Sequence, residues 1–315
     1  MRPEYSIVIP AYNEEDVIIE SYKRLTAALE PLENYELIFV NDGSRDKTAQ
    51  IIYGFVQSDD RVKLLNFSRN FGHQAAITAG MDYARGDAVV VIDADLQDPP
   101  EVILEMAKLW KEGYEVVYGK RQKRHGETAF KKASAKLYYR FLNRMTNVEI
   151  PVDTGDFRLL DRKVCDTMKT MREKSRYVRG LVSWVGYKQT AVEYVRDERF
   201  AGETKYPLSK MIKFAMDGIT AFSYRPLKLA TSLGFFMSLG SFIYLLVIMF
   251  QRLFTDNTIA GWASTIAAVL LSQGIVLMIL GLMGEYIGRI YEEIKDRPLY
   301  IVSEALGYPA DEQFK

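Results

Sequence analysis

Two aspartates follow directly after an apolar run in the sequence. The β-branched run Val89–Ile92 leads into Asp93 and Asp95, and a pair of prolines comes shortly afterwards. A short apolar run that ends in turn signals is typical of a strand buried on both faces of a parallel sheet. Ligands of such sheets bind beyond the carboxyl ends of the strands. The positions of Asp93 and Asp95 therefore predict a binding site.

The chemistry of these two carboxylates points to a divalent cation. Neighbouring carboxylates repel each other, and Mg²⁺ or Mn²⁺, which prefer oxygen ligands, would offset that repulsion. The amide oxygen of Gln97 would be a further ligand, and a diphosphate would complete the coordination. The alternative is that Asp93 and Asp95 only end a strand and stay solvated in a turn, because Asp-x-Asp is a common sequence.

Two other predicted strands end in polar residues that suit a nucleotide. Tyr12 follows the first strand and is placed to stack on a flat base, and Asp42 follows the second and is placed to accept from a base N–H. Asn-Asp-Gly-Ser around Asp42 is also good turn chemistry in any protein. Jointly, the three strand ends predict a nucleotide pocket with a metal beside it. The candidates for binding a nucleotide sugar are Pro10, Tyr12, Glu14, Asp42, Asp93 and Asp95.

Elements of alternating type must position these residues. Apolar strand patterns alternate with helical patterns through the first two-thirds of the chain, and this alternation is typical of an α/β fold with a mostly parallel sheet covered on both faces. We predict strands over residues 5–9, 35–40, 62–66, 88–93 and 115–118, and helices over residues 16–29, 48–56, 74–84 and 100–112.

The composition excludes several classes of function. Lysine plus arginine and aspartate plus glutamate both number 41, so no overall basic charge points to a nucleic acid. Cys165 is the only cysteine, and His73 and His125 are the only histidines, which excludes a disulfide framework and a histidine-rich zinc site. The sequence has neither a G-x-x-x-x-G-K-[ST] loop nor a G-x-G-x-x-G motif after the first strand. A diphosphate would therefore depend on the metal.

Two long apolar runs near the end of the chain predict membrane spans. Residues 227–250 and 261–286 are each long enough, at roughly 1.5 Å per residue, to cross a hydrocarbon layer of roughly 30 Å. A buried hairpin in a soluble core is the alternative. The outer ends of the pair carry several basic residues and the connecting loop only Arg252, which places both chain termini on the cytoplasmic side of a plasma or bacterial inner membrane. No cleavable signal is expected at the start of the chain. The flanking basic residues are Arg225, Lys228, Arg289, Lys295 and Arg297.

An amphipathic segment precedes the first predicted span. Apolar residues recur at helical spacing from Leu208 to Phe222, which suits a helix lying in the membrane interface, although a helix packed on the soluble domain would show the same pattern. Small-residue steps in the spans, such as Gly284-x-x-x-Gly288, would allow close helix packing within the hairpin or in a homo-oligomer. We expect a cytoplasmic catalytic domain (1–205), an interfacial helix (206–226), two spans (227–286) and a cytoplasmic C-terminal tail (287–315).

Seven sequence blocks together resemble the inverting family 2 glycosyltransferases of GT-A fold. Within that family they are most similar to the polyprenyl-phosphate group, which contains the dolichyl-phosphate mannose synthases and the bactoprenol glucosyltransferases. A terminal pair of spans also occurs in bactoprenol glucosyltransferase-like members. The blocks are IPAYNEE (9–15), VNDGSRDKT (40–48), SRNFGHQAA (68–76), DADLQDPPE (93–101), DTGDFRLLDR (153–162), SRYVRGLVSWVG (175–186) and RFAGETKYPL (199–208).

The resemblance implies a GT-A catalytic domain that transfers a single sugar from a nucleotide sugar to a polyprenyl phosphate. It implies that Asp95, Gln97 and Asp93 bind the metal, and it makes Asp156 the candidate base. A lipid phosphate with a second pKa of about 6 is already largely ionised, so positioning by Asp156 is the alternative to deprotonation. Arg121, Arg199 and Lys205 are the candidate cations for the phosphates, with a solvated basic surface beside anionic lipid as the alternative.

The donor is the least constrained part of this interpretation. The resemblance favours UDP-glucose and leaves GDP-mannose or a UDP-aminosugar as alternatives with the same lipid acceptor. A membrane-tethered nucleotide-sugar binding protein without turnover is a different class of function, and the presence of both metal carboxylates and a candidate base speaks against it. We expect His73 to be a helix cap or a wall of the nucleotide pocket rather than a catalyst.

Overall fold

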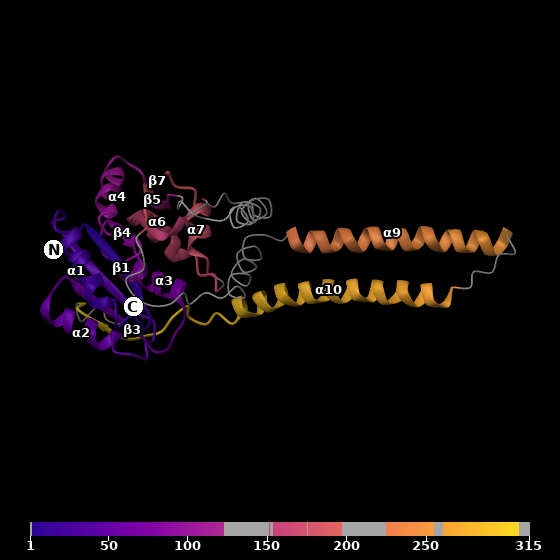
Figure 1. Ribbon diagram of the computed structural model, residues 1–315, viewed down its shortest axis with the longest axis horizontal. Coiled ribbons are helices and arrows are strands. Elements are labelled where there is room, and N and C mark those ends of the chain that lie inside the picture. Colours follow the sequence, from indigo (N-terminus) through magenta and orange to yellow (C-terminus); the bar gives the residue numbers. More distant parts are fainter. Residues whose placement is uncertain are drawn as a thin grey trace.

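The computed structural model describes residues 2–122, 151, 154–174, 176–196, 225–254 and 261–308. Two parts are visible in Figure 1: a domain built around one sheet, and a pair of long helices that extends away from it. The catalytic domain expected from the sequence corresponds to the first part. The predicted interfacial helix over residues 208–222 lies outside the described residues.

One mixed sheet forms the centre of the domain. Its strand order is β7-β5-β6-β4-β1-β2-β3-β8. Neighbouring strands among β1 to β4 are parallel, β6 is antiparallel to both β4 and β5, and β8 is antiparallel to β3. The strands are β1 (Tyr5–Ala11), β2 (Tyr35–Asn41), β3 (Val62–Phe67), β4 (Ala88–Val91), β5 (Val116–Arg121), β6 (Thr154–Asp161), β7 (Gln189–Tyr194) and β8 (Val302–Leu306).

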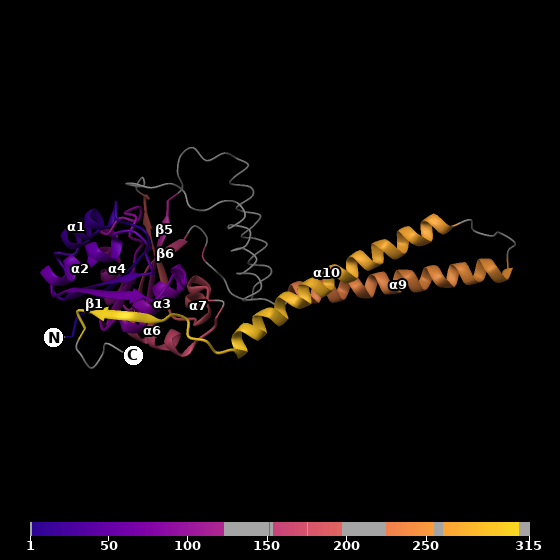
Figure 2. The same cartoon turned by 90° about the horizontal axis from the view of Figure 1, so that it is seen from below.

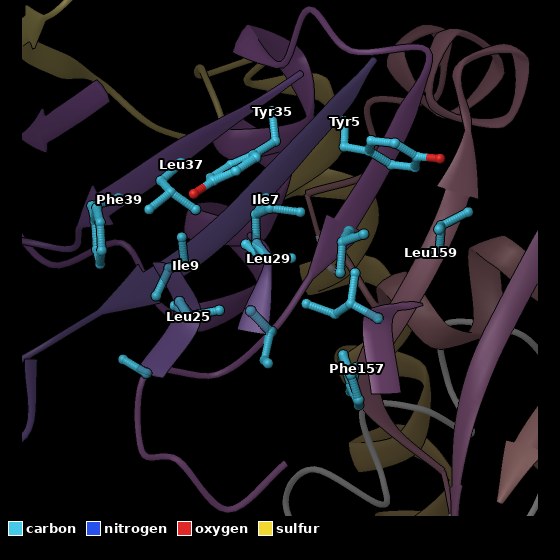
Figure 3. Close-up of a cluster of buried hydrophobic side chains, with 14 of the residues drawn as sticks. Tyr5, Ile7, Ile9, Leu25, Leu29, Tyr35, Leu37, Phe39, Phe157 and Leu159 are labelled. Atoms are coloured by element: carbon cyan, nitrogen blue, oxygen red, sulfur yellow. The ribbon is translucent and has the colours of Figure 1, made fainter. Parts of the chain in front are cut away.

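Helices cover both faces of the sheet because its central strands are apolar on both sides. Ile7 and Ile9 of β1 pack into one buried cluster, whereas Val8 packs into the other, as expected for side chains that alternate across a strand. Figure 3 shows the first cluster, with Leu25 and Leu29 beside β1. The helices of the domain are α1 (Ile18–Ala28), α2 (Thr48–Ser58), α3 (His73–Tyr83), α4 (Val102–Lys111), α6 (Arg162–Thr170) and α7 (Val178–Trp184).

This architecture confirms the predicted α/β class. Each of the five predicted strands and four predicted helices is present, with ends that shift by up to three residues. β6, β7 and β8 were not among the predicted strands. β6 carries Asp156, so its direction and neighbours decide where that residue lies.

The two long helices form an antiparallel hairpin. α9 (Arg225–Phe254) and α10 (Trp262–Ile294) both extend away from the domain, side by side in Figure 1 and crossing at an angle in Figure 2. In the part of the chain that the structure describes, one segment, Ser272–Ile294 of α10, is long and apolar enough to cross a membrane. The corresponding stretch of α9 is the shorter Gly234–Tyr244. One of the two predicted spans thus meets this criterion, and the second stays a prediction.

Small residues contribute unequally to packing within the hairpin. A Cβ atom at Gly234 would lie 3.7 Å from Ile279 Cδ1 of α10, so Gly234 faces the partner helix. At Gly284 and Gly288, a Cβ atom would meet no described atom within 4 Å. Gly234 therefore fits packing inside the hairpin, whereas Gly284 and Gly288 lie away from it.

The chain returns to the domain after α10. We expected a C-terminal tail from residue 287, but α10 continues to Ile294 and β8 then adds to the edge of the sheet beside β3. Figure 2 shows β8 as the yellow arrow lying along the domain. Ala305 of β8 is buried, and Tyr300 stacks on Phe67 with ring centroids 5.4 Å apart. The segment from Tyr300 to Ala305 therefore contributes to the domain core.

Candidate functional site

The predicted site residues that the structure describes lie at one end of the sheet, where the parallel strands have their carboxyl ends. The parallel strands β1, β2 and β4 end there, and β6 begins there because it runs in the opposite direction. The register pairs Val91 with Arg158 and Lys120 with Thr154. Asp156 near the start of β6 is therefore next to Asp93, which follows β4.

Reciprocal hydrogen bonds join the loops after β1 and β2. Asn13, whose φ is +53°, accepts from the Arg45 N–H at 2.9 Å and donates its own N–H to Ser44 Oγ at 3.0 Å. The Glu14 N–H donates to Thr48 Oγ1 at 2.8 Å. These bonds hold the two loops together and form one preorganised wall of the site.

The predicted nucleotide residues on this wall differ in exposure. Pro10 is buried inside β1, whereas Tyr12, just beyond the strand, is 37% exposed and accessible to a base. Asp42 is buried, and its carboxylate accepts from the Phe71 N–H at 2.7 Å and the Gly72 N–H at 3.0 Å. Burial raises the pKa of Asp42, and these hydrogen bonds partly oppose that effect. Asp42 thus fixes the turn before α3, and its contact with a base stays a prediction.

The loop after β4 offers oxygen ligands in a suitable arrangement. Asp93, Asp95 and Gln97 are partly exposed, whereas Ala94 and Leu96 between them are buried. The turn is tight, because the Gln97 N–H donates to Asp95 Oδ1 at 3.1 Å and Leu96 has a φ of +59°. The oxygens of this loop therefore lie on its open side.

Asp93 has the most perturbed carboxyl of this loop. Its Oδ1 atom is buried and makes no hydrogen bond with described residues, and burial raises the pKa of the carboxyl to about 6 although His73 opposes the shift. Among the described residues, no three His, Cys, Asp or Glu side chains form a complete metal site. An oxygen donor set that is open on one side fits a hard cation shared with a diphosphate.

Asp156 is the most heavily paired carboxylate in the site. Arg179 of α7 donates two hydrogen bonds to it, from Nε to Oδ1 at 2.8 Å and from Nη2 to Oδ2 at 3.1 Å. His73 Nε2 lies 3.3 Å from Asp156 Oδ2 and 3.4 Å from Asp93 Oδ1. Gln74 donates to Asp156 Oδ2 at 3.3 Å and accepts from the Val178 N–H at 2.8 Å, which joins α3 to α7.

These contacts determine the protonation states. Burial alone would raise the pKa of Asp156, but Arg179 and His73 hold it well below its usual range. Burial alone would lower the pKa of His73, but Asp156 and Asp93 outweigh this effect and raise it to about 9. At neutral pH, Asp156 is an anion and His73 a cation. A carboxylate with so low a pKa is a weak base, so the geometry favours positioning over proton removal.

Arg121 is the one predicted phosphate cation within the described residues. Its guanidinium lies over Gly155, where a Cβ atom would approach Arg121 Nη2 to 2.7 Å. Arg121 is therefore adjacent to Asp156 along β6. Arg199 and Lys205 lie outside the described residues, so their roles stay predictions.

Several residues of the site were not predicted from the sequence to have the contacts that they make. His73 does begin a helix, as expected, but it bridges two carboxylates rather than capping the helix or only lining a wall. Arg179, Gln74 and Asp98 each belong to a sequence block noted above. Nothing in the local sequence pairs them with their partners, because each main contact spans 23 or more positions.

The similarity of this chain to known proteins covers nearly its whole length. Residues 6–168 match the model for glycosyl transferase family 2, and residues 225–290 match the model named GtrB C-terminal hairpin. The "Uncharacterized glycosyltransferase YkcC" of Bacillus subtilis is 64% identical over 305 residues, which covers 96% of this chain and 94% of that protein.

A second relative and a solved structure are more distant. The "Prophage bactoprenol glucosyl transferase homolog" of Escherichia coli is 41% identical over 299 residues, which covers 94% of this chain and 97% of that protein. The mannosyltransferase PcManGT from Pyrobaculum calidifontis, solved with GDP-Man and Mn²⁺, has a TM-score of 0.46 and 17% identity, with 94% of this chain and 88% of that chain covered. From the family match and the extent of the sequence identity, the chain belongs to glycosyltransferase family 2.

Proposed function

We propose that this protein transfers a single glucose from UDP-glucose to a polyprenyl phosphate, with inversion at the anomeric carbon, at the cytoplasmic face of a membrane. The observation that carries the proposal is the junction at His73, which lies within 3.4 Å of both Asp93 and Asp156. It brings the proposed metal and donor loop to the strand proposed for the acceptor. The E. coli relative named for bactoprenol glucosyl transfer supports this choice of acceptor and sugar.

The donor would be held by the loops at the ends of the parallel strands. Tyr12 would stack on the base, Asp42 would support the wall behind it, and Glu14 would lie at the same edge. Asp95, Gln97 and Asp93 would hold Mg²⁺ or Mn²⁺, which when bound would stabilise the negative charge of the departing diphosphate. The partly exposed side chains of Asp93, Asp95 and Gln97, which alternate with the buried Ala94 and Leu96, support this assignment.

The acceptor would approach from the side of β6. Its phosphate is an anion at neutral pH and needs no strong base, which agrees with the low pKa of Asp156. Asp156 would hold Arg179 and His73 in place around the reacting groups. Arg121, Arg199 and Lys205 would supply positive charge for the phosphates, as charge-assisted contacts with phosphate require.

The helical hairpin would bring the enzyme to its lipid. Apolar side chains along α9 and α10, such as Phe236 and Leu277, are exposed in the hairpin and would be covered by hydrocarbon. The start of α9 and the end of α10 are both at the domain end of the hairpin (Figures 1 and 2). If both helices span the membrane, this arrangement fits a domain and both chain ends on the cytoplasmic side.

A panel of donors tests the proposed reaction. The full chain in detergent would be incubated with undecaprenyl phosphate, Mg²⁺ or Mn²⁺ and one of UDP-glucose, GDP-mannose or UDP-N-acetylglucosamine. We expect a glucosylated lipid with the β configuration from UDP-glucose, because inversion converts the α-linked donor. Transfer from another donor alone would replace glucose in the proposal. If the donors bind but none of their sugars is transferred, a membrane-tethered nucleotide-sugar binding protein without turnover would replace the proposed enzyme.

A further inference from the structure

A buried carboxylate beyond the proposed metal loop lies between two arginines. The side chain of Asp98 is fully buried, and its Oδ1 accepts a hydrogen bond from the Tyr194 hydroxyl at 2.5 Å. Arg196 Nε lies 3.5 Å from the same oxygen, and Arg121 Nη2 lies 3.6 Å from Oδ2. One carboxylate therefore holds two guanidinium groups, one against each of its oxygens.

Tyr194 is placed rigidly enough to orient this carboxylate. It pairs with Arg121 in the register of β7 and β5, and its hydroxyl also accepts from Arg121 Nε at 3.3 Å. Its ring packs edge-on against Phe157 with centroids 5.7 Å apart. Gly119 permits this packing, because a Cβ atom there would lie 2.8 Å from the Tyr194 ring.

The charges in this cluster do not balance. Two guanidinium groups face one carboxylate, at distances longer than good hydrogen bonds, and Asp98 Oδ2 and Arg196 Nε make no hydrogen bond with described residues. The side chains of Arg121 and Arg196 remain 30% and 27% exposed. A buried ionic group that is only partly satisfied leaves positive charge and N–H donors for an anion at the surface.

The cluster faces the proposed acceptor side of the site. Arg121 lies over Gly155, the residue before Asp156, so an anion on the exposed side of its guanidinium would be next to the start of β6. Planar guanidinium groups suit the oxygens of a phosphate monoester, because each offers several N–H donors in a fixed plane.

We propose that Asp98 is a positioning residue that, together with Tyr194, holds Arg121 and Arg196 as a two-guanidinium cradle for the phosphate monoester of the acceptor lipid. The inference rests on the proposed function for the identity of the acceptor. It adds Arg196 as a phosphate-binding residue, and it assigns to Asp98 an effect that acts through the two arginines rather than through the donor or the metal.

Single variants of the full chain in detergent test the direction of the effect. Asp98→Asn should raise the KM for polyprenyl phosphate about tenfold and leave the KM for the nucleotide sugar and kcat within about twofold, because only the binding of the acceptor depends on the cradle. Arg196→Ala should raise the same KM by a similar factor. Tyr194→Phe, which keeps all three charges, should raise it by about threefold.

A combined variant tests whether Asp98 acts through the two arginines. When residues act as one unit, their effects are not additive, so Asp98→Asn should change the KM by less than about twofold in a background that carries both Arg121→Ala and Arg196→Ala. Glu193→Gln is the matched control, because it removes the exposed ion pair of Glu193 with Lys120 on the same two strands. It should behave like the wild type.

Direct binding separates this inference from the proposed reaction. Calorimetric titration of each variant with a short-chain polyprenyl phosphate, and separately with UDP, requires no turnover. If the wild type binds the lipid phosphate and Asp98→Asn binds it about tenfold more weakly, the inference holds even if no donor is transferred. If the wild type transfers sugar but Tyr194→Phe and Arg196→Ala keep the wild-type KM and affinity for the lipid phosphate, the inference is wrong and the proposed function stands. The Tyr194→Phe and Arg196→Ala results decide the matter if Asp98→Asn does not fold.

Discussion

Asp156 carries its negative charge among the side chains of Arg179, His73 and Gln74, and these partners limit what its carboxylate can do. Both oxygens accept hydrogen bonds, and the pKa lies well below the usual range of a carboxyl. Such a group organises cations around a reacting phosphate more readily than it removes a proton. His73 gains the role that the sequence did not suggest, because its imidazolium links Asp156 to Asp93.

The protonation of His73 can be measured directly, since only His73 and His125 contribute histidine signals. In metal-free protein, we expect the imidazole of His73 to titrate near pH 9, and Asp156→Asn should lower its pKa by roughly one unit, because one of the two carboxylates that stabilise the imidazolium is removed. Nuclear magnetic resonance of histidine-labelled protein gives both midpoints, with His125→Gln to assign the signals. An unchanged midpoint in Asp156→Asn would contradict the bridging role.

The raised pKa of His73 also makes the stability of the folded protein depend on pH. The pKa of His73 is higher in the folded protein than the usual value near 6.5, so its contribution to stability is fully present below that value. It is lost as the pH rises through about 9. The difference in thermal midpoint between the wild type and His73→Gln should therefore shrink between pH 7 and pH 10.

Asp95 is the residue on which the proposed metal site depends most. Asp95→Asn should lower the transfer rate by about 100-fold or more while the protein stays folded, because a bound cation contributes several kcal/mol of charge stabilisation and Asp95 lies in a loop outside the core. Rates would be measured with and without EDTA and with Mg²⁺ or Mn²⁺ added back. Asp87→Asn, near the other end of β4, is the control and should be unaffected. Full activity of the wild type in EDTA would rule out the metal.

At the scale of elements, strand direction places the site. β6 runs antiparallel between β4 and β5, so its first residues meet the last residues of its neighbours at one edge. β8, which follows the hairpin in the chain, is the edge strand of the sheet beside β3. Two hydrogen bonds connect three strands: Asn66 of β3 donates to Glu304 of β8 at 2.9 Å, and Asn41 of β2 donates to Asn66 at 3.0 Å. The last strand is therefore linked to the loop that carries Asp42.

β8 should therefore contribute to the stability of the domain. Ala305 is buried against the α3 side of the sheet, and Ala305→Asp would bury an unpaired charge at a cost of about 2–4 kcal/mol. The midpoint of thermal unfolding of the full chain in detergent should fall clearly. Glu304→Ala on the exposed face of the same strand should cost about 1 kcal/mol or less. Equal midpoints for wild type and Ala305→Asp would show that β8 is dispensable for the fold.

At the scale of the whole molecule, the hairpin is attached to the domain by more than the chain itself. The Lys174 N–H donates to Glu293 at 2.7 Å, and Lys174 Nζ lies 3.0 Å from Asp296, so the end of α10 meets the segment between α6 and α7. Since α7 carries Arg179, the contact connects the base of the hairpin with the element that holds Asp156. If the hairpin spans a membrane as proposed, this contact would set the orientation of the site relative to that membrane.

The single cysteine offers a reporter of global unfolding. Cys165 of α6 is buried, and burial raises the pKa of its thiol to about 12. At pH 8, roughly one molecule in ten thousand would carry the reactive thiolate. We expect no alkylation of the folded protein by iodoacetamide over an hour and rapid alkylation in denaturant, as followed by mass spectrometry. Rapid reaction without denaturant would show that the domain opens around α6.

The sequence alone determined the class of the fold and the position of the polar residues at its strand ends. Periodicity is a local property, so alternating apolar patterns were sufficient to predict β1 to β5 and the helices between them. The polar residues at the ends of these strands were predicted for the same reason, because the ends of parallel strands share one edge. The family blocks also pointed to Asp156 before its strand was known.

Only the tertiary structure decided which charges meet. Asp156 and Arg179 are 23 positions apart, and Asp98 and Tyr194 are 96 apart, and no local pattern encodes such pairs. The pKa of a buried group depends on the side chains packed around it, so the weak basicity of Asp156 and the charge of His73 emerge only when β4, β6, α3 and α7 are brought together. For the same reason β8 could not be predicted, because a five-residue strand after a long helix forms only where an open sheet edge is available to pair with it.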